Sequence, residues 1–263
     1  MDGVCRTGLL IAQTSGNNSR VSNVFLSQKA IPIQERLIFA LDVSSRAEAE
    51  SWVNNLGSAV SFYKLGLQIF MAGEYFPLVE WLKNQGKKVF VDLKFFDVPE
   101  TVRSAVHELR DKRIEFVTVH GNDDMLRAAV EEKDAIKILA VTVLTSLDRH
   151  DLQDLGFSCD VTELVLSRAK RALAIGCDGV ISSGIEAPRL REHLGNSFLI
   201  VSPGIRPVDN RLVDDQKRTV DVERAFHNGA DYIVVGRPIR NAPNPREKAE
   251  EIQSRIAVIF NKQ

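Results

Sequence analysis

Short apolar runs alternate with longer stretches of mixed polarity along most of this chain. The runs are rich in Val, Ile, Leu and Phe and are bounded by polar residues, Gly or Pro, which is the pattern of buried β-strands. They predict strands at residues 37–41, 61–65, 88–93, 116–119, 136–143, 179–181, 198–201 and 232–235.

The stretches between these runs carry apolar residues at helical spacing. They predict helices at residues 47–55, 75–84, 101–111, 125–132, 162–175, 188–194, 222–228 and 245–260. Strands that alternate with helices form parallel βαβ units, and eight units in about 230 residues fit a single (β/α)8 TIM barrel over residues 34–263. A doubly wound open sheet is the alternative, but no GxGxxG motif follows the first predicted strand, which counts against its dinucleotide-binding form.

The first 33 residues lack this alternation. An apolar run at residues 8–12 is too short for a secretory signal, and Asp2 precedes it. Polar residues follow at 13–20. We expect residues 1–33 to be a poorly ordered N-terminal extension without chemistry, and residues 34–263 to be the catalytic barrel.

Charge and cysteine content exclude several classes of protein. The formal net charge is −1, so no basic field favours nucleic acid. No apolar run approaches the roughly 20 residues that a membrane helix needs. Cys5, Cys159 and Cys177 have no CxxC spacing, which indicates reduced thiols rather than a disulfide frame or a zinc site. We therefore expect a cytoplasmic protein that binds neither nucleic acid nor membranes.

Asp92 and Lys94 lie at the end of the third predicted strand. Because side chains alternate along a strand, both point to the same face, which is normally apolar in a buried strand. A structural ion pair would explain them, since buried charges are usually paired. A catalytic pair is the other explanation, because TIM barrels carry their active sites at the carboxyl ends of the strands.

Further polar residues lie at or just after the ends of predicted strands, with Asp97 past the end of the third: Asp42, Lys64, Asp97, His120, Thr145 and Ser146. Several have simpler explanations. Asp97 could form a capping box with Glu100 for the next helix, and Thr101 could merely belong to its first turn. Asp42 could orient a sugar hydroxyl or cap a helix. His120 is more often hydrogen-bonded scaffold, and no second His gives metal spacing, so we expect no metal site.

The last two predicted strands end in residues suited to an anion. Gly204 and Arg206 follow the seventh strand, and Gly236 and Arg237 follow the eighth. Glycine lets the backbone approach an anion closely, and the forked donors of arginine match phosphate oxygens. Loops after these two strands often bind phosphate in TIM barrels, so together the residues predict a phosphate site.

The connection from residue 203 to residue 221 is long for a βα loop, where about 2–6 residues are usual. It is polar throughout. A surface loop without function is one interpretation. The other is a lid over a phosphorylated ligand, with Gln216 and Arg206 as its contacts.

Six motifs, in order along the chain, resemble orotidine 5′-phosphate decarboxylases of the bacterial type. They are residues 40–42 (ALD), 63–66 (YKLG), 92–99 (DLKFFDVP), 141–146 (VTVLTS), 203–207 (PGIRP) and 236–239 (GRPI). The third motif contains the specific D-x-K-x-x-D pattern. Phe96 replaces an expected His, Glu100 replaces an Asn and Val98 replaces an Ile, but no charged member of the pattern is lost.

This resemblance implies a TIM barrel that converts orotidine 5′-phosphate to uridine 5′-phosphate, the last step of de novo pyrimidine nucleotide synthesis, without a cofactor. It implies a homodimer with active sites at the interface. Its implied catalytic residues are Lys94 as proton donor, Asp92 beside the substrate carboxylate, and Asp97, which with Thr101 is contributed across the interface. By the same resemblance, Lys64 and Asp42 lie near the ribose hydroxyls, Thr145 faces the pyrimidine, and Val98 also binds the substrate. The implied phosphate contacts are Arg206, Gln216, Gly236 and Arg237.

Two alternatives remain from the sequence. Related sugar-phosphate decarboxylases and aldolases use a similar D-x-K-x-x-D motif with a magnesium ion that stabilises an enediolate. Lys64 and the long connection after residue 203 favour the nucleotide instead. A degenerate barrel that only binds a nucleotide monophosphate would be expected if a charged residue of the array were missing, and Lys64, Asp92, Lys94 and Asp97 are all present.

Overall fold

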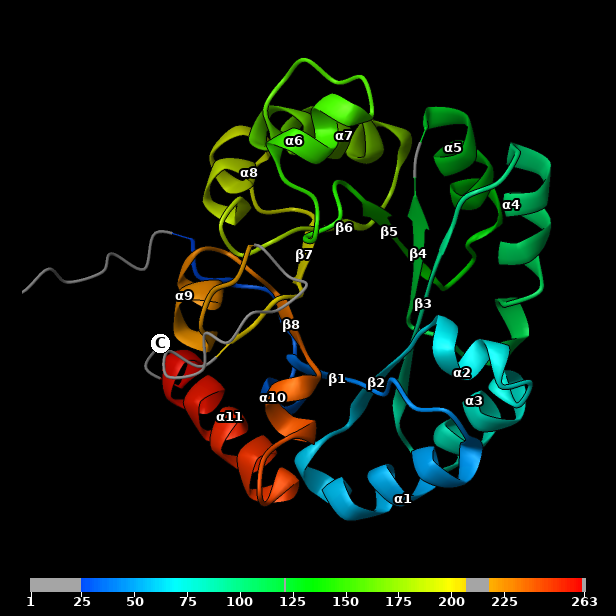
Figure 1. The fold of residues 1–263 in the computed structure, drawn as a ribbon, viewed down its shortest axis with the longest axis vertical. Helices are drawn as coiled ribbons and strands as arrows, with labels where there is room; N and C mark the ends of the chain where they lie inside the picture. The colour runs from blue at the N-terminus through cyan, green and yellow to red at the C-terminus, as the bar shows by residue number, and fades with distance from the viewer. Residues whose placement is uncertain (1–24, 121, 207–217, 262–263) are drawn as a thin grey trace, which may run out of the picture.

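The computed structural model describes residues 25–120, 122–206 and 218–261. Parallel strands pair in sequence order and the last pairs with the first, which closes the predicted (β/α)8 barrel (Figure 1). The strands are β1 (Leu37–Ala40), β2 (Phe62–Leu65), β3 (Lys88–Phe95), β4 (Phe116–His120), β5 (Lys137–Val141), β6 (Gly179–Ile181), β7 (Leu199–Ser202) and β8 (Tyr232–Val235).

Helices surround the barrel as an outer ring (Figure 1). The predicted helices are present as α1 (Arg46–Leu56), α3 (Tyr75–Asn84), α4 (Pro99–His107), α5 (Asp123–Glu132), α7 (Val161–Ile175), α8 (Ala187–Leu194), α9 (Val222–His227) and α11 (Pro245–Phe260). Three further short helices were not predicted: α2 (Leu67–Met71), α6 (Arg149–Asp154) and α10 (Arg237–Arg240). Single 3-10 turns are found at Ile33–Glu35, Gly57–Ala59 and Arg110–Lys112.

Side-chain caps explain where several of these helices begin. Ser45, Asp160, Asp221 and Asn244 each precede a helix and accept a hydrogen bond from a backbone N–H in its first turn. Such caps satisfy donors that the helix itself leaves unpaired. Helix α4 begins differently from the prediction, at Pro99, because proline needs no N–H partner in the first helical turn.

Two apolar layers form the core. The larger lies between the strands and the surrounding helices, and the smaller fills the inside of the barrel. Aromatic rings dominate the inner layer, where Phe116 packs against Phe62 and Tyr232 at centroid distances of 5.1 Å. Side chains on a strand alternate, so the inward position after Phe62 is Lys64 and the one after Phe90 is Asp92. The charged side chains therefore lie directly above the inner apolar layer, toward the carboxyl ends of the strands.

The chain packs against the barrel from before residue 34, where the catalytic domain was predicted to start. Leu26 is buried, Ser27 donates a hydrogen bond of 2.5 Å to Asp231, and Lys29 forms an ion pair of 3.1 Å with the same carboxylate. Asp231 is fully buried at the start of β8 and needs these partners. The packed unit therefore includes residues 25–33, and residues 1–24 lie outside the described part of the chain.

The structure also bears on membrane insertion and on the state of the cysteines. Within the described ranges, no helix combines the length and apolar composition needed to cross a bilayer. Cys159 and Cys177 are both free thiols, and burial raises the pKa of Cys177 to about 12, which keeps this thiol protonated. Cys5 lies outside the described residues.

Candidate active site

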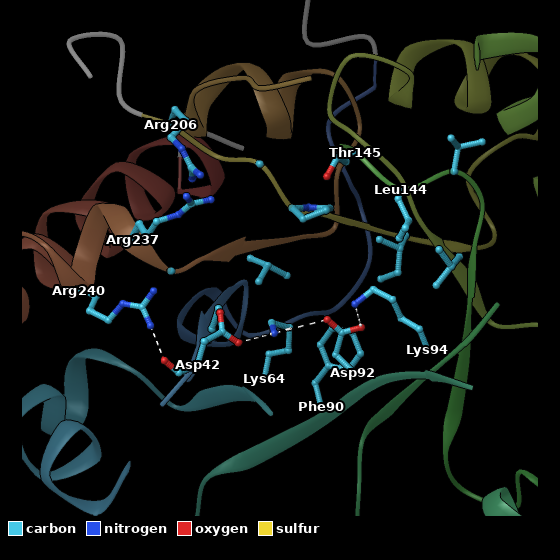
Figure 2. A pocket seen from close by; sticks show the side chains of 18 residues that line it. Asp42, Lys64, Phe90, Asp92, Lys94, Leu144, Thr145, Arg206, Arg237 and Arg240 are labelled. Atoms are coloured by element: carbon cyan, nitrogen blue, oxygen red, sulfur yellow. Dashed lines mark hydrogen bonds and ion pairs between the residues drawn. The ribbon is translucent and has the colours of Figure 1, made fainter. Parts of the chain in front are cut away.

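A pocket opens at the carboxyl ends of the strands, where the barrel was predicted to carry its chemistry (Figure 2). Its floor includes Phe90 of the inner apolar layer. Nine of the residues predicted from the sequence line it: Asp42, Lys64, Asp92, Lys94, Thr145, Gly204, Arg206, Gly236 and Arg237.

Four of these side chains form a row of alternating charge across the pocket (Figure 2). Lys64 Nζ lies 3.1 Å from Asp42 Oδ1 and 3.5 Å from Asp92 Oδ2. Lys94 Nζ donates to the other oxygen of Asp92 at 2.9 Å. One carboxylate therefore holds two ammonium groups, and both lysines come from inward positions of neighbouring strands.

The row keeps its charges despite burial. Burial alone would raise the pKa of Asp92, but the charges of Lys64 and Lys94 and the hydrogen bonds from Lys94 and Thr118 outweigh it and lower this pKa. Burial alone would lower the pKa of Lys64, but Asp92 and Asp42 outweigh it and raise this pKa. Asp92 stays ionised and Lys64 stays protonated at neutral pH.

A bulge in β3 positions Lys94. Val91 pairs with Val117 and Phe95 pairs with Val119, so residues 92–94 stand opposite the single residue 118 of β4. Lys94 adopts a left-handed backbone with φ of 49°, which costs a residue with a side chain on the order of 1–2 kcal/mol. The regular backbone hydrogen bonding between β3 and β4 is therefore interrupted at Lys94.

Thr118 fills the gap opposite this bulge and was missed by the sequence analysis. Its Oγ1 accepts the backbone N–H of Lys94 at 2.9 Å and donates to Asp92 Oδ1 at 3.0 Å. The side chain is fully buried. A signal was present in the sequence, because Thr118 occupies the next inward position after Phe116 in an otherwise apolar strand.

Arginines occupy the side of the pocket opposite Lys94, Leu144 and Thr145 (Figure 2). Arg206 follows β7, and Arg237 begins α10 after β8. Gly236 allows β8 to end close to β1, since a Cβ there would lie 3.2 Å from the Cβ of Ala40. Arg240, not predicted, also lines the pocket and donates to the backbone carbonyl of Asp42. Three guanidinium groups thus make this side strongly positive.

The two ends of the long connection after β7 meet at the arginine side. Arg206 N–H donates to the carbonyl of Val220 at 2.9 Å, and Val220 N–H donates to the carbonyl of Gly204 at 3.3 Å. Arg218 donates to Glu186 and to the carbonyls of Val143 and Leu144, which follow β5. Gln216, predicted to contact phosphate, lies outside the described residues.

Three described residues that the family resemblance places at the substrate do not line this pocket. Asp97, Val98 and Thr101 are exposed and lie beyond the end of β3. Asp97 accepts the N–H of Val98 at 2.7 Å, but Val98 is the N-terminal cap of α4 and no side chain caps this helix. The capping box suggested for Asp97 and Glu100 is therefore wrong, and the structure leaves the Asp97 carboxylate at the surface.

Large apolar side chains are also exposed, both in this segment and on α2. Phe96 is 65% exposed and Val98 is 62% exposed, next to the end of β3. Leu67, Phe70 and Met71 are exposed on α2, which directly follows the neighbouring strand β2. Exposed apolar groups of this size are typical of surfaces that another protein covers.

His120 ends β4 and Ser146 lies in the connection after β5, but neither lines the pocket. The ring of His120 contacts Phe96 edge-on at 5.3 Å, and burial together with the charges of Arg168 and Lys94 lowers its pKa. The described residues hold no group of three or more His, Cys, Asp or Glu side chains arranged to bind a metal ion.

The family model and the similar proteins that match this chain all point to one enzyme family. The model of the "Orotidine 5′-phosphate decarboxylase / HUMPS family" matches residues 35–252. The chain is 62% identical to orotidine 5′-phosphate decarboxylase of Methylococcus capsulatus, over 90% of this chain and 98% of that protein. It is 47% identical to the enzyme of that name from Xylella fastidiosa, over 85% of this chain and 92% of that one.

A solved structure agrees in fold. The orotidine 5′-phosphate decarboxylase of Lactobacillus acidophilus superposes with a TM-score of 0.74 and 34% identity, covering 84% of this chain and 99% of that one. Together with the pocket at the barrel mouth, these matches show that the chain belongs to the orotidine 5′-phosphate decarboxylase family, the carboxy-lyases that make uridine 5′-phosphate in pyrimidine nucleotide synthesis.

Proposed function

We propose that Lys94 is the proton donor of this decarboxylation. The bond between C6 of the pyrimidine and its carboxylate breaks, carbon dioxide leaves, and the electron pair stays on C6. The Nζ of Lys94 then gives its proton to C6, and the neutral amine regains a proton from solvent. The observation that supports this role is the Lys94 ammonium in the pocket wall, anchored 2.9 Å from Asp92.

A fixed cation suits this reaction because the electron pair at C6 lies in the plane of the ring, where the π system cannot delocalise it. A preorganised positive charge stabilises such an anion more strongly in a pocket with little water than in bulk solvent. Lys94 would act both as this charge and as general acid. Asp92 would lie beside the substrate carboxylate, where it keeps Lys64 and Lys94 oriented.

The remaining pocket residues would hold the nucleotide. Asp42 and Lys64, 3.1 Å apart, would bind the ribose hydroxyls between the base and the phosphate. Thr145 would contact the pyrimidine from the Lys94 side. Arg206, Gly236 and Arg237 would bind the phosphate, with Gln216 as a further contact. Because the phosphate is remote from the bond that breaks, its binding free energy can order the site around the base.

We further propose that the active enzyme is a homodimer, with Asp97, Val98 and Thr101 reaching the pocket of the partner. Their exposure beyond the end of β3, outside their own pocket, supports this arrangement. The exposed apolar side chains of α2 and of the segment after β3 supply a surface that a second copy would bury. We expect this dimer to work in the cytoplasm without a cofactor.

One assay tests the overall function. Purified protein should consume orotidine 5′-phosphate, with the ultraviolet absorbance of the substrate changing to that of uridine 5′-phosphate, equally fast with and without a chelator. A rate that falls in chelator and recovers with magnesium would contradict the cofactor-free mechanism and favour the sugar-phosphate branch of the family.

A second experiment tests the shared site. Lys94→Ala and Asp97→Ala should each be inactive alone. After mixing and subunit exchange, heterodimers hold one site with both changes and one with neither, so about a quarter of the wild-type activity should return if subunits pair at random. No recovery, with exchange confirmed by mass spectrometry, would place Asp97 and Lys94 in the same chain's site.

A further inference from the structure

The bulge in β3 removes Lys94 from the regular hydrogen-bond ladder of the barrel. Residues 92–94 face only Thr118 on β4, so the backbone N–H of Lys94 has no carbonyl opposite it in the strand register. A buried N–H without an acceptor costs free energy comparable to a lost hydrogen bond. Some group must replace the ladder at this position if the left-handed backbone of Lys94 is to persist.

The hydroxyl of Thr118 supplies that group and does a second task with the same atom. Its oxygen accepts the Lys94 N–H at 2.9 Å, while its O–H donates to Asp92 Oδ1 at 3.0 Å. Asp92 Oδ1 is also the atom that holds Lys94 Nζ, at 2.9 Å. A single hydroxyl therefore contacts both ends of the ion pair, the main chain of the lysine and the carboxylate that anchors its ammonium.

We propose that Thr118 is a positioning residue for catalysis, which fixes the Lys94 ammonium by holding its strained backbone and the Asp92 carboxylate together. This inference rests on the proposed role of Lys94. Thr118 does not line the pocket, so it would act through Lys94 and Asp92. A hydroxyl suits this position because its single oxygen accepts from one neighbour and donates to the other, which a carbonyl oxygen or an N–H alone cannot do.

The expected effect lies in turnover and not in binding. A misplacement of about 1 Å in a catalytic group can reduce the rate by about 100-fold. Thr118→Val keeps the shape of the side chain and removes both hydrogen bonds, so we expect kcat to fall by about 100-fold. The dissociation constant of uridine 5′-phosphate should change less than about threefold, because the ribose and phosphate contacts stay in place.

Two variants separate positioning from packing. Thr118→Ser retains the hydroxyl and should restore kcat to within about threefold of the wild type. Thr142→Val is the matched control, since Thr142 is also fully buried and its hydroxyl donates to the carbonyl of Ile181 at 2.9 Å, away from Lys94. This control should keep kcat while losing a similar amount of stability. If Thr118→Val does not fold, Thr118→Ala serves in its place.

Amide hydrogen exchange provides a readout that does not depend on the reaction. The Lys94 amide should be protected in the wild type and in Thr118→Ser, and should exchange at least about tenfold faster in Thr118→Val. Unchanged kcat in Thr118→Val, equal loss in Thr118→Ser, or equal loss in Thr142→Val would each overturn the inference. Retained turnover in Lys94→Ala would instead overturn the proton-donor role, while the exchange measurement would still report on the Thr118 hydrogen bond.

Discussion

Two carboxylates, Asp231 fully buried and Asp92 half-buried, lie at opposite ends of the barrel, and each holds two cationic side chains. At the carboxyl ends of the strands, Asp92 binds Lys64 and Lys94. At the amino ends, Asp231 binds Lys29 and Arg191, with distances of 3.1 and 2.8 Å. In residue types the two clusters are nearly the same. Asp92 itself lines its pocket, whereas Lys29 and Arg191 border a small cavity that Asp231 does not line.

In the cluster around Asp231, here called the lower cluster, protein donors satisfy the carboxylate completely. Asp231 also accepts from Ser27 and from the backbone N–H of Ile200, so both of its oxygens have several donors. Arg191, only 1% exposed in its side chain, further donates to the carbonyls of Gly229 and Phe198. This network joins α8, the start of β8 and residues 25–33, which is a structural task.

The cluster around Asp92, here called the upper cluster, is packed against protein on one side and borders the pocket on the other. The side chain of Lys94 is 36% exposed and its ammonium lies in the pocket wall. Its protein partner for the ammonium is Asp92, and its backbone depends on the hydroxyl of Thr118. The comparison teaches that an ion cluster marks a functional site when its carboxylate lines a cavity, and marks a scaffold when protein donors saturate both oxygens of a carboxylate that lines none.

The largest expected difference between the clusters comes from replacing their lysines. Lys94→Ala should lower kcat by at least about 10⁴-fold, because it removes both the general acid and the fixed cation. Binding of uridine 5′-phosphate, measured by titration calorimetry, should remain. Lys29→Ala is the matched control and should keep kcat. If Lys94→Ala turned over near the wild-type rate, the upper cluster would not be catalytic and would not differ in function from the lower one.

Removing the lower carboxylate should act on stability alone. Asp231→Ala leaves Lys29 and Arg191 without their counter-ion, so the free energy of unfolding should fall by about 3–5 kcal/mol. Urea titration followed by circular dichroism measures it. Per folded molecule, kcat should be unchanged. A large loss of kcat without a loss of stability would show that the two ends of the barrel are coupled.

Arg237→Ala tests the positive side of the pocket. The loss of a guanidinium paired with a desolvated phosphate should cost about 2–5 kcal/mol of transition-state stabilisation, which appears as a lower kcat/KM. Steady-state kinetics measures this change, and Arg246→Ala on the surface of α11, where Arg246 pairs with Glu250, is the control. An unchanged kcat/KM would place the phosphate elsewhere.

The smallest effect is a pH dependence of stability in the upper cluster. The pKa of Asp92 is lowered in the folded state from its ordinary value of 3.8, so its contribution is present above that value and is lost as the pH falls through the folded pKa. The difference in unfolding free energy between wild type and Asp92→Asn should therefore be constant from about pH 5 to about pH 7, and should shrink below about pH 4. A difference that grows on acidification would contradict the sign.

The alternation of apolar runs was enough to predict the barrel, because each strand is buried on both faces and each helix on one. The same alternation predicted the convergence of Lys64, Asp92 and Lys94, since their positions follow inward-facing apolar residues. Other features depend on contacts between distant segments. Helix α2 spans only five residues and α10 only four, too short to leave a periodic signal.

The bulge was also beyond the sequence. Its register depends on how β3 pairs with β4, and the demand for Thr118 appears only once Lys94 has left the ladder. The packing of residues 25–33 was missed for a similar reason, because their main partner, Asp231, is about 200 positions away in the chain. The roles proposed for Asp97 and Thr101 at an interface came only from resemblance to a family.

The left-handed backbone of Lys94 has a consequence for heat inactivation. A conformation that a lysine normally avoids persists only while its surroundings enforce it. When warming loosens the contact between β3 and β4, the main chain can relax to a commoner conformation while the remaining strands stay paired. Activity would then disappear reversibly at temperatures where the circular dichroism spectrum is still that of the intact barrel.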